Sequence, residues 1–127
     1  MSGSAHRVVG IDHVQLAMPP GPEAEAAAVA FFEGLLGLPR VAKPPELAER
    51  GGCWFERGRV KLHMGVDQDF RPARKAHPAL VVVDLDGLCR LLDESEHPTR
   101  RTEDVPGRPQ WYVDDPFGNR IELIPGS

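Results

Sequence analysis

Residues 115–124, DPFGNRIELI, decide the fold of this 127-residue chain. The first five are turn residues, because proline presets φ while glycine and asparagine tolerate positive φ. The last five alternate in polarity, which predicts a short strand. Because successive strand side chains point to opposite faces, Glu122 lies on the face away from Ile121 and Leu123. The stretch therefore predicts a hairpin whose final strand carries one carboxylate on its second face.

Length and composition indicate one globular domain. A chain of 127 residues with 41% hydrophobic and 27% charged residues is long enough for a single core. The net charge of −4 means that the chain has no excess of basic residues, so neither nucleic acid nor an anionic membrane is an expected partner. We find no apolar run of transmembrane length and no signal peptide, and we expect a cytoplasmic protein. Cys53 and Cys89 are then expected to be reduced rather than bridged.

The apolar pattern predicts the same order of elements twice, namely a strand, a helix and further strands. The predicted strands cover residues 11–18, 52–58, 59–66, 77–83, 97–105, 110–115 and 120–124, and the predicted helices cover 23–36 and 85–92. Asp84 is a plausible N-cap for the second helix.

The two halves of the chain are also similar in sequence. When DHVQLAM (12–18) is superposed on AHPALVV (76–82), His13 falls on His77. When the two hairpins are superposed, His63 falls on Glu122. Each half therefore has a histidine at its first strand and a histidine or glutamate in its last strand.

Three imidazoles and one carboxylate are ligands suited to a divalent Fe, Zn, Ni, Mn or Co ion. Alternation places each of them opposite its hydrophobic neighbours, and if both sheets curl these faces look into one concavity. A histidine taken alone is more simply a hydrogen-bonded residue of a half-buried strand. The matched positions favour a metal site formed by His13, His63, His77 and Glu122.

Further residues are candidates for contact with a small-molecule substrate. Gln15 shares a strand face with His13, and one residue of each aromatic pair, 54–55 and 111–112, must face the concavity. The basic run 71–75 is either a solvated linker or an anion clamp at the mouth of the cavity. The candidate substrate contacts are Gln15, Trp54, Arg74, Trp111 and Tyr112.

Three segments carry a resemblance to a known family. DPFGNRIEL resembles the Asp-Pro-x-Gly-Asn-x-Ile-Glu-Leu ending of the vicinal oxygen chelate superfamily, which includes glyoxalases, bleomycin-resistance proteins, extradiol dioxygenases and fosfomycin-modifying transferases. FFEGLLGLPR (31–40) and IDHVQLAM (11–18) resemble the family's post-helix signature and first strand. The resemblance implies an α+β fold in a single domain, 1–127. Two β-α-β-β-β modules, about 8–66 and 76–125, would form a cupped eight-stranded mixed sheet.

The same resemblance implies a function. It assigns metal ligation to His13, His63, His77 and Glu122, although dioxygenase-like and fosfomycin-type members use only the equivalents of the first, third and fourth. The implied protein is a homodimeric metal-dependent lyase, isomerase or dioxygenase, acting on a small molecule that chelates the ion through neighbouring oxygens. In an isomerase or lyase, Glu122 would also be the catalytic base. The alternative is a binding protein of the bleomycin-resistance kind, which sequesters a small molecule without catalysis.

Overall fold

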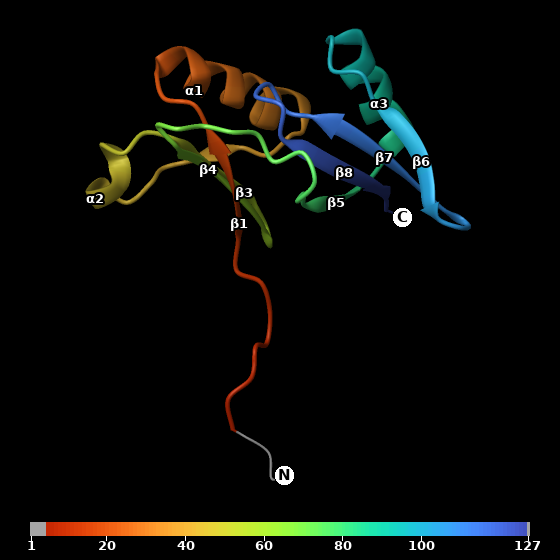
Figure 1. Cartoon of the computed structure of the whole chain (residues 1–127), viewed down its shortest axis with the longest axis horizontal. Coiled ribbons are helices and arrows are strands. Elements are labelled where there is room, and N and C mark those ends of the chain that lie inside the picture. Colours follow the sequence, from red (N-terminus) through yellow and green to blue (C-terminus); the bar gives the residue numbers. More distant parts are fainter. Residues whose placement is uncertain (1–4, 127) are drawn as a thin grey trace.

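The computed structural model describes residues 5–126, and its eight strands form two four-stranded sheets (Figure 1). The first sheet has the order β1-β4-β3-β2 and consists of β1 (Val14–Met18), β4 (Val60–Val66), β3 (Cys53–Arg57) and β2 (Arg40–Val41). The second has the order β5-β8-β7-β6 and consists of β5 (Ala79–Val82), β8 (Arg120–Pro125), β7 (Arg108–Asp114) and β6 (Arg100–Val105). The identical orders confirm the α+β class and the two modules predicted from the repeat.

The first and last strands of each module lie side by side. β1 pairs with β4, and β5 pairs with β8, both in parallel, whereas the remaining pairs in each sheet are antiparallel. This pairing brings the polar residues of the first and last strands next to each other. It also leaves β1 and β5 at the edges of their sheets.

Helices cover one side of the two sheets (Figure 1). The helix predicted over 23–36 is α1 (Pro22–Ala28), continued by the π-helix η1 (Val29–Leu35), and Gly37 follows it with a φ of 74°. In the second module, α3 (Leu85–Glu94) begins after Asp84, whose carboxylate accepts from the Gly87 amide at 3.2 Å, as the predicted N-cap requires. The short α2 (Pro45–Ala48) and β2 were not predicted, because elements of four and two residues show no periodicity.

The core fills the space between the helices and the sheets. Its fully buried large side chains include Met18, Phe31, Phe32, Phe55 and Leu92. The two cysteines are free, and burial raises the pKa of both thiols. They are unbridged, as expected from the sequence, and behave as small apolar residues.

A buried asparagine joins the modules. Asn119 is fully buried, and its Nδ2 donates to the Ala17 carbonyl of β1 and to the Asp115 carboxylate, both at 2.8 Å. Its Oδ1 accepts from the Ala73 amide at 2.8 Å. Burial raises the pKa of Asp115, although bonds from Asn119 act in the opposite direction. These bonds tie the turn before β8 to the first strand of the other module.

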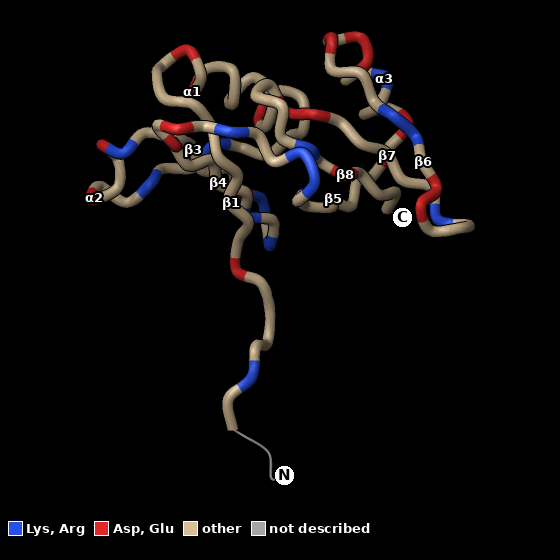
Figure 2. The backbone as a smooth tube through the Cα atoms, viewed as in Figure 1, with Lys and Arg blue, Asp and Glu red and all other residues tan. Residues whose placement is uncertain are grey.

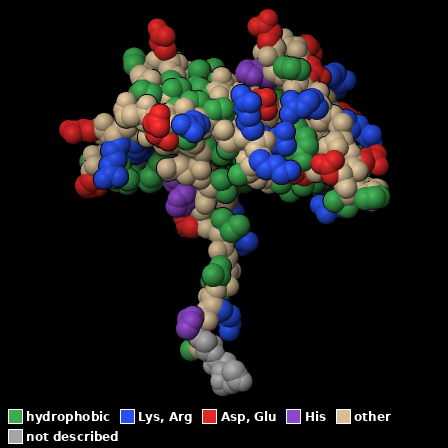
Figure 3. All heavy atoms as spheres, in the orientation of Figure 1, with side chains coloured by type: hydrophobic (Ala, Val, Ile, Leu, Met, Phe, Trp, Pro, Cys, Tyr) green, Lys and Arg blue, Asp and Glu red, His purple; other side chains and the backbone are tan. Residues whose placement is uncertain are grey.

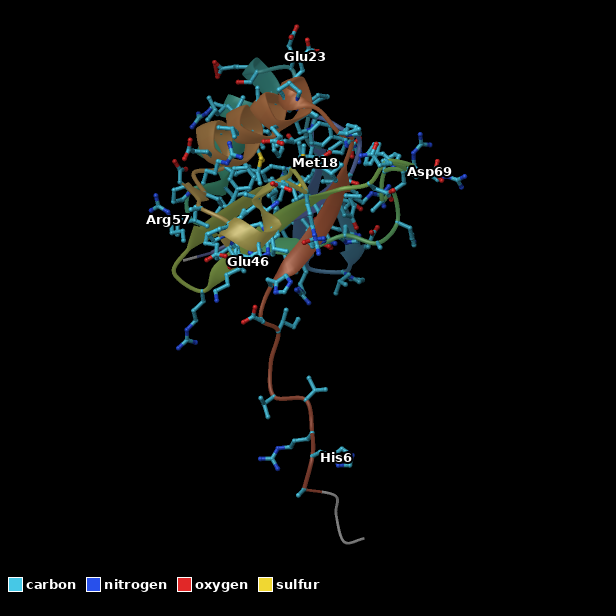
Figure 4. All side chains as sticks on the ribbon, turned by 90° about the vertical axis from the view of Figure 1, so that its left-hand side faces the viewer. His6, Met18, Glu23, Glu46, Arg57 and Asp69 are labelled. Carbon is cyan, nitrogen blue, oxygen red and sulfur yellow. The ribbon has the colours of Figure 1, made fainter. Side chains whose placement is uncertain are left out.

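The segment before β1 extends away from the body of the protein (Figures 1 and 4). Val8, Val9 and Ile11 in this segment are 92%, 88% and 86% exposed. Among residues 5–126, no helix has the length and apolar character needed to cross a membrane.

Candidate metal half-sites

The second module brings together His77 and Glu122. Ala79 of β5 is paired with Glu122 of β8, so the histidine just before β5 lies beside the carboxylate. His77 Nε2 is 2.9 Å from Glu122 Oε1, and the two side chains are 23% and 13% exposed. The sequence predicted these two as ligands of one ion, and the fold places them in contact.

A second hydrogen bond of His77 shows which of its two ring nitrogens carries a hydrogen. Its Nδ1 lies 2.7 Å from the Lys75 carbonyl oxygen, which can only accept, so Nδ1 carries a hydrogen. In a neutral ring, Nε2 then presents a lone pair to a carboxylate oxygen, and two acceptors repel. A proton or a cation is needed between them. An imidazole nitrogen and a carboxylate oxygen are both common ligands of divalent ions, so this pair would suit such an ion.

Two residues of β7 support the pair. Gln110 is buried, and its Nε2 donates to Glu122 Oε2 at 2.9 Å. Tyr112 is paired with Glu122 across the ladder, and its ring meets that of His77 edge-on at 5.4 Å. Tyr112 was a predicted site residue, whereas Gln110 was not identified. Its only signal was the strand alternation that places it on the same face as Tyr112.

The first module stacks three rings. Buried His63 lies between Trp54, at 4.0 Å and 3° between ring planes, and His13, at 4.6 Å and 21°. The Nε2 atom of His63 is 2.8 Å from Glu56 Oε2, in a pair that the sequence analysis did not identify. That nitrogen is therefore already engaged by a carboxylate. In this structure His63 is thus hydrogen-bonded through Nε2, and its role as a fourth ligand stays a prediction.

His13 is the more open of the two histidines. Its side chain is 45% exposed, and its Nδ1 is 2.8 Å from Asp12 Oδ2. This hydrogen bond, with the charge of Lys61 as a second cause, lowers the pKa of Asp12. A carboxylate on one imidazole nitrogen orients the other for a metal. Asp12 thus contacts one nitrogen of the His13 ring and leaves the other nitrogen open.

The four predicted ligands form two pairs rather than one cluster. Within residues 5–126, no three or more His, Cys, Asp or Glu side chains lie close enough to hold a metal ion. One pair, His13 and His63, belongs to the first module, and the other, His77 and Glu122, belongs to the second. Within one chain, the predicted ligands therefore lie in two separate places, one in each module.

The other predicted substrate contacts, Gln15, Arg74 and Trp111, do not lie together in one place. Gln15 is opposite His63 in the β1–β4 ladder, and its side chain lies against Gly65, where a Cβ atom would clash with it. Arg74 is exposed in the loop before β5. Trp111 is paired with Leu123 and packs against the core, on the face opposite Glu122, so the structure does not bring it to the His77–Glu122 pair.

A cavity of about 1250 Å³ opens between the edge strands β1 and β5. Its apolar lining includes Leu16, Leu80 and Leu123, and both His13 and His77 border it. The first histidines of the two modules therefore open onto the same space.

Comparison with known proteins places the chain in a family. No protein-family model and no curated protein matches the sequence. Among solved structures, a glyoxalase family protein from Bacillus anthracis is 40% identical, with a TM-score of 0.89 over 98% of this chain and 100% of that one. A fosfomycin resistance protein from Listeria monocytogenes is 13% identical, with a TM-score of 0.73 over 95% and 96% of the two chains.

A lactoylglutathione lyase from Agrobacterium tumefaciens is 20% identical, with a TM-score of 0.67 over 95% and 96% of the two chains. The last two similarities concern the fold alone. The first, at 40% identity over the full length of both chains, identifies the family. The chain belongs to the glyoxalase family, within the vicinal oxygen chelate superfamily.

Proposed function

We propose that the protein is a cytoplasmic homodimeric metal enzyme that acts on a small molecule with two neighbouring oxygens. One divalent ion is held by His77 and Glu122 of one subunit and by His13 of the other. The observation that carries this proposal is the contact of 2.9 Å between Nε2 of His77 and Oε1 of Glu122. Because Nδ1 of His77 is committed to a carbonyl oxygen, this contact calls for a positive charge between the two atoms.

A second copy supplies His13 more readily than a rearrangement of one chain. Closing the two modules of one chain on each other would strain or break the buried bonds of Asn119 to Ala17 and Ala73. The free edge of β5 also presents apolar side chains, since Val81 and Val83 are 74% and 75% exposed. An exposed apolar sheet edge needs a cover, and a two-fold dimer provides one for both copies.

A divalent ion held by His13, His77 and Glu122 would supply Lewis-acid chemistry toward two neighbouring substrate oxygens. Glu122 serves as a ligand, and in a lyase or isomerase it also accepts a proton. His63 is a second candidate proton acceptor. In its neutral form, with the Nε2 hydrogen donated to Glu56, Nδ1 of His63 carries the free lone pair. Gln110 holds Glu122 in place, and Tyr112 limits the tilt of the His77 ring.

Sequestration of a small molecule without catalysis is the second candidate. The apolar lining of the cavity between β1 and β5 favours it, because apolar walls bind ligands by burial alone. This function requires neither the His77–Glu122 pair nor an ion. The two candidates therefore differ in whether ligand binding depends on metal.

The test is metal content after purification without chelators, followed by equilibrium dialysis against Fe²⁺, Zn²⁺, Ni²⁺, Mn²⁺ and Co²⁺. We expect one ion per chain, and we expect His77→Ala and Glu122→Gln to lose most of the affinity while Glu94→Gln, on the exposed side of α3, retains it. Iron would favour a dioxygenase, and nickel, zinc or cobalt a lyase or isomerase. Equal affinity in His77→Ala and wild type would contradict the proposal.

A further inference from the structure

Several basic residues lie around the His77–Glu122 pair. The chain has a net charge of −4, yet Arg71, Arg74, Lys75 and Arg120 lie in or beside the loop that leads to His77. None of these four makes an ion pair with another residue in the range 5–126, whereas Arg40, Lys61, Arg100 and Arg101 each do. Figures 2 and 3 show the basic residues over the loop before β5.

Backbone bonds hold this loop against the start of β8. The Arg120 amide donates to the Ala73 carbonyl at 2.8 Å, and the Ala73 amide donates to the side chain of Asn119. The Lys75 carbonyl accepts from His77. The loop cations and Arg120 therefore flank the His77–Glu122 pair as a consequence of the fold.

Arg120 is the best placed of these cations. It lies two residues before Glu122 in β8, so both side chains are on the same face of the sheet. Its guanidinium carbon is 4.9 Å from the centre of the Tyr112 ring, which in turn contacts His77 at 5.4 Å. A small molecule bound at His77 would thus have Arg120 within reach across a single aromatic ring.

The opposite strand does not neutralise this charge by an ion pair. Asp114 faces Arg120 across the ladder, but its carboxylate oxygen lies 3.7 Å from Arg100, and no carboxylate of residues 5–126 is within ion-pair distance of Arg120. A half-buried guanidinium stacked on an aromatic face keeps its edge donors available for a ligand.

We propose that Arg120 binds an anionic group of the small molecule, a carboxylate or a phosphonate, while the loop cations attract it to the His77–Glu122 pair. Such groups accept two parallel hydrogen bonds from a guanidinium. The substrate is therefore an anion whose charged group lies a few bonds from its metal-binding oxygens. The anion site itself rests on Arg120 alone, and only the position of those oxygens rests on the proposed metal site.

The first experiment uses metal-free protein, so that it does not depend on the proposed metal function. Inorganic phosphate and acetate are titrated at constant ionic strength into wild type, Arg120→Gln and Arg90→Gln, and backbone amide shifts are followed. We expect shifts around residues 118–122, and about tenfold weaker binding in Arg120→Gln, the loss expected for one charge-assisted contact. Arg90→Gln, on exposed α3, should match wild type. Equal phosphate affinity in Arg120→Gln and wild type would overturn the proposal.

The second experiment uses metal-loaded protein and separates the two anion chemistries. Hydroxymethylphosphonate and glycolate are compared with uncharged ethylene glycol by calorimetry. Arg120→Gln should weaken the anion that the site prefers and leave ethylene glycol unchanged, while Arg120→Lys, which keeps the charge but loses the planar fork, should lie between. An equal loss for ethylene glycol would mean that Arg120 only supports the neighbouring residues, and would also overturn the proposal.

Discussion

Replacing Gln110 by leucine tests whether the carboxylate of Glu122 is held in place for a ligand. The two side chains have similar sizes, so the change mainly removes the donor that lies 2.9 Å from Glu122 Oε2. Gln110 is buried and Glu122 is 13% exposed, so water cannot easily replace the lost bond. Glu122 is then free to rotate away from His77.

The size of the effect follows from this bond. A hydrogen bond to a charged group contributes roughly 1.5–3 kcal/mol, and each 1.4 kcal/mol changes a binding constant by about tenfold. We therefore expect Gln110→Leu to weaken metal binding by about 10- to 100-fold, which is also the usual effect of removing an outer partner of a metal ligand.

The assay is competition for Zn²⁺ or Co²⁺ with a chromophoric chelator, with thermal unfolding as a check on the fold. Gln68→Leu, in the exposed loop after β4, is the matched control and should bind metal like wild type. If Gln110→Leu stays folded and binds metal within twofold of wild type, Gln110 does not position the ligand and the reasoning is refuted.

Three further predictions concern stability. Asn119→Ala removes three side-chain hydrogen bonds and should lower the free energy of unfolding in urea by about 3–5 kcal/mol; a loss below 1 kcal/mol would mean that the modules are held by other contacts. Burial raises the pKa of Asp115 above 3.8, so the folded state holds this proton more tightly than the unfolded chain. We therefore compare the free energy of unfolding of wild type with that of Asp115→Asn. The difference, wild type minus variant, should fall as the pH rises from about 3.8 through the raised pKa of Asp115, and it should stay level at higher pH. A rise of this difference over the same pH range would contradict the prediction. Glu56→Leu leaves the buried His63 without its partner and should cost about 1–3 kcal/mol, whereas Glu56→Gln, which keeps an acceptor, should cost less; equal losses in urea would show that the hydrogen bond is unimportant.

The fold could be predicted from sequence because its signals are local and repeated. The turn before Glu122 and the stripe of α3 each have a pattern of their own, and the match of His13 with His77 links the halves. The pairing of β5 with β8 then follows from the two-module arrangement. The two short elements β2 and α2 carry no such pattern and were missed.

The site was predicted less completely, because its partners meet through tertiary contacts. Alternation placed Glu122 on the face away from Ile121 and Leu123, but it could not decide which aromatic of residues 111–112 shares that face. The bonds from Gln110 to Glu122 and from Asp12 to His13 depend on side-chain directions within the fold. The division of four ligands into two pairs depends on how the modules are fixed relative to each other, to which the buried Asn119 contributes three hydrogen bonds.

The central claim is that one metal site combines His13 of one subunit with His77 and Glu122 of the other, and mixing two inactive variants tests it most directly. Neither His13→Ala nor Glu122→Gln dimers should bind metal tightly on their own. In a purified heterodimer, both defects fall in one of the two shared sites, so the other site is fully wild type. The account predicts one tightly bound ion per heterodimer, with the affinity of wild type. If each site belonged to a single chain, both sites would carry one defect, and a heterodimer that binds no ion tightly would contradict the account.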